Sequence, residues 1–220
     1  MRSLVVGQLA SAVLLSFATL AVAAPFGNGS FESGTNPGSY TPLNTGDNSS
    51  ITGWLVGGAP GNGIDYIGSL WQPSDGSRSI DLNGTNLNTN SSVGSISQTF
   101  DTVAGVQYQV QFDLSGNPYG GPATKTLTAS AAANSQPFSY TIGANTLANM
   151  MWQSNTFNFI ATGASTTLTF ASTTLNSNFG PALDNVRVSA VTPEPASMAL
   201  WLLATGAVTV VARRRQRVAA

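Results

Sequence analysis

Histidine and cysteine are both missing from the 220 residues, and this double absence limits the chemistry that the chain can support. A Ser-His-Asp triad, a Cys-His dyad and a zinc site with imidazole or thiolate ligands are impossible. No disulfide can form either, so the fold must be held by core burial or by a bound metal. A polysaccharide-cleaving enzyme needs only two carboxylates, and this class stays open. Because spacing singles out no pair of carboxylates, we interpret the chain as a non-enzyme.

Charge is scarce as well, at 8% of the residues. Five of the eight basic residues lie near the two ends, so the stretch 24–192 holds three basic residues against eight acidic ones, a net charge of −5. Such a stretch lacks the basic surface that nucleic-acid binding requires. Low charge together with abundant Ser, Thr, Asn and Gly is typical of a secreted, surface-exposed β protein.

Sustained helical periodicity is absent between the ends, and short β-prone runs alternate with turn residues there. Residues 106–113 alternate apolar and polar side chains, which predicts a strand with one buried face. Residues 129–134 and 83–92 are interpreted as loops. About ten strands of this length form two packed sheets. The expected strands are 51–56, 64–71, 78–82, 95–100, 106–114, 125–131, 138–142, 151–160, 166–171 and 182–190.

The first 23 residues are typical of a secretory signal peptide. Arg2 is followed by an apolar stretch over 4–20, and residues 21–23 (Ala-Val-Ala) form a small-x-small cleavage site. Cleavage after Ala23 would leave residues 24–191 as the folded domain.

The C-terminal segment 192–220 has three parts. Pro193, Glu194 and Pro195 interrupt any regular element. Residues 196–212 carry no charge, and as a helix they would measure roughly 26 Å, just enough for a bilayer core of about 30 Å. The arginine cluster that follows, 213–217, would stay on the cytoplasmic side and leave the domain outside.

This tripartite order resembles the PEP-CTERM sorting signal of Gram-negative bacteria. The resemblance implies processing by a membrane-embedded exosortase, a transient stay in the inner membrane and delivery to the cell surface or extracellular matrix. A plain C-terminal membrane anchor is the alternative.

Six short patches of the domain together resemble the galactose-binding-like jelly rolls, and within them the choice-of-anchor C family of bacterial surface proteins. The resemblance implies an all-β jelly-roll sandwich without a defined activity. The patches are 28–32 (Asn-Gly-Ser-Phe-Glu), 51–54 (Ile-Thr-Gly-Trp), 64–67 (Ile-Asp-Tyr-Ile), 79–84 (Ser-Ile-Asp-Leu-Asn-Gly), 94–100 (Gly-Ser-Ile-Ser-Gln-Thr-Phe) and 180–188 (Gly-Pro-Ala-Leu-Asp-Asn-Val-Arg-Val).

Glu32 and Asp184 belong to the first and last of these patches. In galactose-binding-like modules with similar ends, the terminal strands lie close together and carry a structural Ca²⁺, so the resemblance implies that these two carboxylates bind calcium. Calcium prefers six to eight oxygen ligands, and Asp81 is a further candidate. The alternative is that Glu32 caps a turn and Asp184 bonds the N-terminal backbone.

Five aromatic residues are candidates for a sugar-binding surface, because a ring face can pack against a sugar while neighbouring amides bind its hydroxyls. They are Trp54, Tyr66, Trp71, Tyr119 and Trp152. Trp54 is expected in the core. Trp71 and Tyr119, beside Pro73 and between Pro118 and Gly120, are expected in loops outside the core and are the predicted ligand contacts. The favoured function is an exported surface or exopolysaccharide-associated protein that binds glycan without catalysis. A polysaccharide-cleaving enzyme and a purely structural biofilm component are the alternatives.

Overall fold

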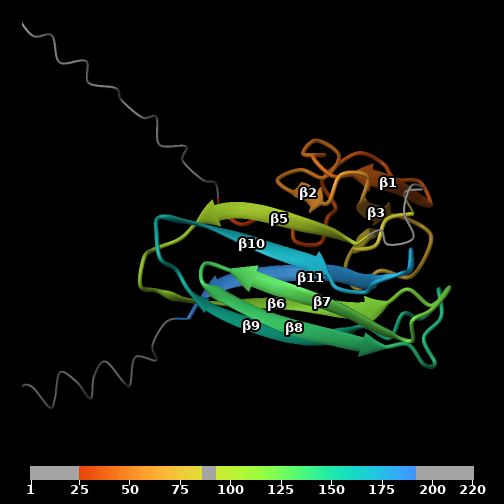
Figure 1. Ribbon diagram of the computed structural model, residues 1–220. Helices are drawn as coiled ribbons and strands as arrows, with labels where there is room; N and C mark the ends of the chain where they lie inside the picture. Colours follow the sequence, from red (N-terminus) through yellow and green to blue (C-terminus); the bar gives the residue numbers. More distant parts are fainter. Residues whose placement is uncertain (1–24, 86–92, 192–220) are drawn as a thin grey trace, which may run out of the picture.

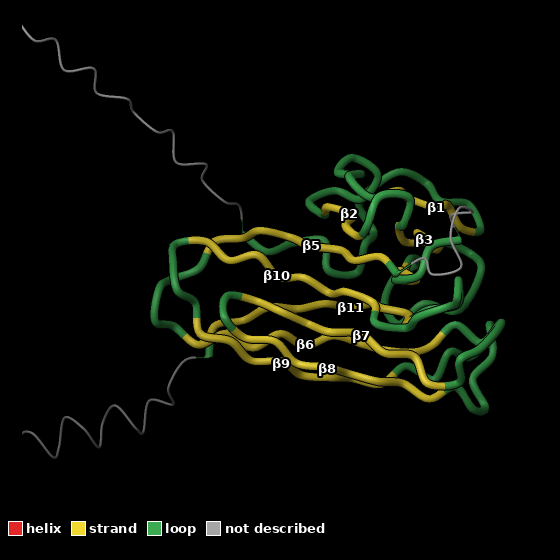
Figure 2. Tube along the Cα trace, viewed as in Figure 1, coloured by secondary structure: helices red, strands yellow, loops and turns green. Residues whose placement is uncertain are grey.

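The computed structural model describes residues 25–85 and 93–191, and in these ranges the chain forms two antiparallel sheets and no helix (Figures 1 and 2). The six-stranded sheet has the order β1-β3-β4-β11-β6-β9 and the five-stranded sheet the order β2-β5-β10-β7-β8. The predicted all-β jelly-roll sandwich is confirmed. The strands are β1 Tyr40–Asn44, β2 Leu55–Gly58, β3 Gly63–Ile67, β4 Ser79–Asp81, β5 Gly94–Asp101, β6 Gln107–Gly116, β7 Thr124–Ala131, β8 Asn134–Thr141, β9 Gln153–Ile160, β10 Ser165–Ser172 and β11 Pro181–Ala190.

The main core lies between the two sheets and follows the period-two pattern of the sequence. On β6, the predicted alternation places Val110, Phe112 and Leu114 inside with at most 1% exposure, whereas Gln107 and Gln111 face solvent. Phe112 also meets Phe170 of the opposite sheet at a ring-centroid distance of 4.9 Å. Aromatic pairs of this geometry and the burial of apolar surface between the sheets hold the sandwich together without a disulfide.

Several strands differ from the sequence-based expectation, for example 55–58 where 51–56 was expected and 134–141 where 138–142 was expected. The unpredicted strand β1 contains Pro42 and lies at a sheet edge, where proline does not interrupt the hydrogen-bond ladder. Residues 129–134 are not a loop, because Ala131 pairs directly with Asn134 across the β7–β8 turn. The strand expected over 64–71 ends at Ile67. Of the loop expected over 83–92, residues 86–92 lie outside the described residues.

A bulge in β11 changes which side chains face the core. The pairing with β6 is regular up to Asp184 and resumes shifted at Arg187, and Asn185 between them has a φ of 54°. Because of this extra residue, Leu183 and Val186 both reach the core although they are three positions apart.

The outer face of the six-stranded sheet is partly buried under loops. A second apolar cluster of Ile67, Trp71, Met150 and Ala182 lies apart from the main core, and Leu70, Leu147 and Trp152 pack against it. The loops 68–78 and 143–152 therefore cover this face, and polar side chains below them are shielded from water.

The signal peptide predicted over 1–23 and the apolar span predicted over 196–212 lie outside the described residues. Within the described residues, the chain has no helix with the length and hydropathy needed to cross a bilayer.

Candidate functional site

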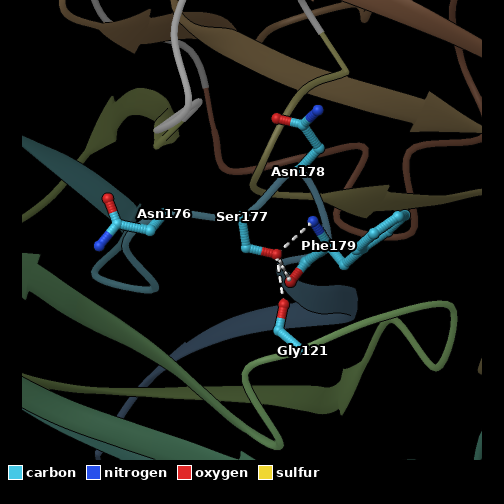
Figure 3. A pocket seen from close by; sticks show the side chains of 5 residues that line it. All are labelled: Gly121, Asn176, Ser177, Asn178 and Phe179. Atoms are coloured by element: carbon cyan, nitrogen blue, oxygen red, sulfur yellow. Dashed lines mark hydrogen bonds between the residues drawn. The ribbon is translucent and has the colours of Figure 1, made fainter.

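A hollow of about 540 Å³ opens between the β6–β7 and β10–β11 connections, and Gly121 and residues 176–179 line it (Figure 3). The hydroxyl of Ser177, one of these residues, donates to the Gly121 carbonyl at 2.6 Å and accepts from the Phe179 N–H at 2.9 Å. The side chains of Asn176 and Asn178 point away from Ser177 in different directions. The hollow thus combines an aromatic ring, amide groups and backbone carbonyls.

Tyr119 lies beside this hollow. Its predicted exposure is confirmed, because the residue is 57% exposed. Its ring contacts that of Phe179 at a centroid distance of 6.4 Å and an angle of 44°. Gly120 makes this arrangement possible, because a Cβ there would lie 2.3 Å from the Phe179 ring. The backbone N–H of Tyr119 donates to Asn117 Oδ1 at 3.0 Å, which fixes the loop. Tyr119 and Phe179 together form an aromatic edge.

Buried polar side chains hold the two loops from below. Asn83 donates through Nδ2 to the carbonyls of Thr174 and Ser177 at 2.9 and 2.7 Å, and it accepts from the Ser172 hydroxyl. Asp81 accepts from the Gly180 N–H at 3.0 Å and from Asn117 Nδ2 at 2.8 Å. Burial raises the pKa of Asp81 to about 8. Asp81, expected as an additional calcium ligand, thus uses its oxygens to position these loops.

Lys125 joins both loops directly underneath the aromatic edge. Its side chain is completely buried, and Nζ donates to the carbonyls of Gly120 and Phe179, each at 2.6 Å. Burial lowers the pKa of the ammonium, and the nearby carboxylate of Asp81 acts in the opposite direction. Sequence reasoning missed this residue. The sequence did indicate its burial, because Lys125 alternates in step with Leu127 and Ala129 on the apolar face of its strand.

Glu32 and Asp184 both bind the loop 74–78, at its two ends. Glu32 Oε1 accepts from the N–H groups of Ser77 and Arg78 at 2.8 Å, and Asp184 Oδ2 accepts from those of Ser74 and Asp75 at 2.7 and 3.0 Å. Glu32 therefore caps a turn, as the alternative interpretation predicted. Asp184 binds backbone too, but that of this loop and not that of the N-terminus.

The donor set for calcium is poor in this arrangement, because the carboxylate oxygens of Glu32 and Asp184 already accept N–H groups. The second oxygen of Asp184 accepts from the Asn185 N–H at 2.6 Å. In residues 25–85 and 93–191, no three acidic side chains are grouped so that they could hold a metal ion. Asn185 Oδ1 is the buried side-chain atom in this part of the chain that lacks a hydrogen-bond partner. Calcium binding stays a prediction, and the geometry favours capping.

Melting curves distinguish the two roles of Glu32. We expect Glu32→Ala to lower the free energy of unfolding by about 1 to 2 kcal/mol, because it removes the acceptor of two N–H groups. Glu32→Gln should cost less, since the amide oxygen still accepts. The loss of stability in each variant should be the same in EDTA and in millimolar calcium. A rise of about 5 °C in wild-type melting temperature with calcium, abolished in Glu32→Gln, would instead establish the metal site.

The structure does not bring Trp71 and Tyr119 together. The prediction that Trp71 lies outside the core is wrong, because it is 4% exposed and its indole N–H donates to the Ser79 hydroxyl at 2.8 Å. Its segment has no regular structure, although 64–71 was also expected as a strand, and it folds back onto the sheet. Tyr66 is fully buried, and Trp152 is half-buried with its indole N–H on the Gln72 carbonyl. Trp54 lies in the core, 2% exposed, as predicted.

Comparison with known proteins identifies both parts of the chain. Residues 24–189 match the family described as "Protein of unknown function (DUF642)", and residues 191–216 match the PEP-CTERM protein-sorting motif. The chain belongs to the DUF642 family. The predicted sorting signal is thereby confirmed, whereas the narrower resemblance to the choice-of-anchor C family stays a prediction.

Three individual proteins that are similar to this chain share between 12% and 34% of its residues over the matched stretches. Halomucin of Haloquadratum walsbyi is 34% identical over 173 residues, which cover 73% of this chain and 2% of that protein. TmCBM61, solved in complex with beta-1,4-galactotriose, is 13% identical with a TM-score of 0.45 over 76% of this chain and 99% of that one. A family 35 carbohydrate binding module from Clostridium thermocellum is 12% identical with a TM-score of 0.44 over 70% and 99%.

Proposed function

We propose that this DUF642 domain binds a glycan, without cleaving it, at the hollow beside Tyr119 and Phe179. The exposed aromatic edge carries the proposal, because the C–H face of a sugar packs on such rings. The amides of Asn176 and Asn178 lie next to it, and amides bind hydroxyl groups. Acid or base catalysis of glycoside cleavage would need two carboxylates, and the residues lining this hollow include no acidic side chain.

The hollow also has a suitable position on an exported protein. The β6–β7 and β10–β11 connections lie at one end of the sandwich, whereas β11 ends at the other, near Val191 where the sorting motif begins (Figure 1). If the chain is attached through its C-terminus, the hollow faces away from the attachment. We infer a surface or matrix protein that is sorted by an exosortase and holds a polysaccharide at its far end.

Tyr119→Ala should weaken glycan binding at least tenfold, or about 1.4 kcal/mol, and leave the melting temperature almost unchanged. The ring is exposed, so its loss removes a ligand contact and little packing. A glycan array identifies the strongest neutral oligosaccharide, and calorimetry then compares the variant with wild type. Tyr40→Ala is the matched control, because Tyr40 is also exposed but lies on β1. An array without any hit would contradict the proposal and favour a purely structural matrix role.

The sorting hypothesis has a separate test. In protein recovered from the native host, intact-mass measurement should show an N-terminus at Ala24 and a C-terminus near Pro193 to Pro195, because the signal peptide and the apolar tail are both removed. A mature pool that retains residues 213–220 would contradict exosortase processing and leave the plain anchor.

A further inference from the structure

A second hollow of about 540 Å³ lies where the turns 36–38 and 68–69 meet the loop 73–78. The turns are in close contact, since a Cβ at Gly68 would lie 2.2 Å from the Gly38 carbonyl oxygen. Pro73, Arg78 and the largely buried Trp71 are among the residues that line it. This hollow is separate from the one beside Tyr119 and shares no lining residue with it.

Arg78 is a half-buried cation whose guanidinium contacts only neutral groups among the described residues. Its Nη1 donates to the Tyr66 hydroxyl at 2.6 Å and to the Gly34 carbonyl at 3.4 Å, and the guanidinium carbon lies 5.5 Å from the centre of the Tyr66 ring. Among the described residues, no carboxylate lies within ion-pair distance of the guanidinium. Loss of hydration makes an anionic partner favourable for such a cation.

The carboxylates near this arginine are engaged elsewhere. Glu32 accepts from the backbone N–H groups of Ser77 and Arg78, and its other oxygen accepts from the Ser77 hydroxyl at 2.7 Å. Asp75 accepts from the Ser30 hydroxyl at 2.6 Å. The guanidinium N–H groups other than those of Nη1 thus remain available to a ligand in the hollow. The planar arrangement of donors in a guanidinium matches a carboxylate, which can accept two parallel hydrogen bonds.

We propose that this second hollow binds the carboxylate of an acidic sugar, a uronic acid residue, through Arg78. Pro73 contacts the sugar ring, and the hydroxyls of Ser69 and Ser77 lie beside its polar groups. The inference extends the proposed function to acidic polysaccharides. It rests on residues outside the Tyr119 hollow, so either proposal can fail without the other.

Calorimetry on the purified full-length protein tests this with two trisaccharides that differ only at C6. The probes are a β-1,4-linked mannuronate trimer and β-1,4-mannotriose, in which each carboxylate is an alcohol. We expect the acidic trimer to bind at least tenfold more tightly, and added salt to weaken its binding. Arg78→Gln should lower its affinity about 10- to 100-fold, since hydrogen bonds to charged groups are lost. Arg78→Lys should bind the acidic trimer almost as weakly as Arg78→Gln, because lysine lacks the paired donors of a guanidinium.

Two controls separate a specific site from general charge effects. Arg187→Gln removes the same charge from an exposed position on β11 and should leave binding of the acidic trimer unchanged. Tyr119→Ala should also leave it unchanged, whatever its effect on neutral glycans. Equal losses in Arg78→Gln and Arg187→Gln would overturn the proposal, as would equal affinity for the two trisaccharides or no binding of the acidic trimer at millimolar concentration.

A further variant avoids the contacts of Arg78 with Tyr66, whose loss could itself weaken the fold. Ser69→Asp leaves Arg78 intact and adds a carboxylate to the exposed lining of the hollow. It should weaken binding of the acidic trimer at least tenfold at an unchanged melting temperature, whereas Ser69→Asn should bind it like wild type. Unchanged affinity in Ser69→Asp would show that the acidic trimer binds elsewhere. Displacement by sodium acetate at the same concentration as the trimer would show a simple anion site and would overturn the assignment to a sugar.

Discussion

We expect Trp71→Ala to lower the free energy of unfolding by about 3 to 5 kcal/mol, the range for a large aromatic side chain removed from a core. Trp71 fills the space between Ile67, Met150 and Ala182 on the outer face of the six-stranded sheet. Its removal leaves a cavity there. It also removes the indole N–H that donates a hydrogen bond to the buried Ser79 hydroxyl. At about 2 to 4 °C per kcal/mol for a domain of this size, the melting temperature should fall by about 6 to 20 °C.

Thermal and urea denaturation of Trp71→Ala, Trp71→Phe and wild type measure this effect. Trp71→Phe keeps part of the apolar volume and loses the hydrogen bond, so its loss of stability should lie between the other two. Tyr119→Ala, studied in parallel, should melt close to wild type. If Trp71→Ala also melts within 2 °C of wild type, the loop 68–78 does not pack on the sheet as described, and Trp71 again becomes a candidate for ligand contact.

The core strands were predictable because burial on one face leaves a period-two pattern in the residues themselves. Residues 106–113 show it, and β6 follows it. This pattern is missing where a strand is short, polar or covered on both faces. In β1, the run 40–44 has one buried residue, Leu43, and a proline, so local propensity argued against a strand. Its pairing with β3 stabilises it, and that long-range contact cannot be read from five residues.

The candidate site was predictable only in part. Tyr119 follows Pro118 and precedes Gly120, and these neighbours correctly indicated an exposed loop. The same reasoning failed for Trp71, because a loop residue becomes buried when its segment folds over a sheet, and neighbouring residues do not reveal that. The contributions of Asn83 and Lys125 depend on partners about 50 to 100 positions away in the chain. Such contacts need the three-dimensional arrangement, although Lys125 on an apolar face was a visible exception.

The domain should lose stability as the pH rises from about 4 to 8, because three aspartates of the six-stranded sheet are buried. Burial is the main cause that raises the pKa of Asp65 to about 6, of Asp184 to about 7 and of Asp81 to about 8. Asp65 and Asp81 are also directly opposite each other on β3 and β4, so each charge disfavours the other. The unfolded chain ionises all three near pH 4.

The sign follows from the direction of these shifts. Below about pH 4 the carboxyl groups are protonated in both states, and the folded state has its full stability. Above that pH the unfolded chain releases protons that the folded state retains, so the free energy of unfolding decreases until the pH has passed the folded-state values of about 6 to 8. Melting temperatures measured between pH 4 and pH 8.5 should therefore fall throughout this range.

Asp65→Asn should remove part of this pH dependence and stabilise the domain at pH 8. The carboxylate accepts from the N–H and the hydroxyl of Thr85 at 3.0 and 3.1 Å through a single oxygen, and an amide oxygen can accept both. A shift of about two pKa units corresponds to about 2 to 3 kcal/mol, or roughly 4 to 12 °C in melting temperature at pH 8, with little difference at pH 4. Asp101→Asn, at an exposed position on β5, is the matched control and should follow the wild-type curve. An Asp65→Asn variant that melts below wild type at pH 8 would show that the ionised carboxylate stabilises this sheet.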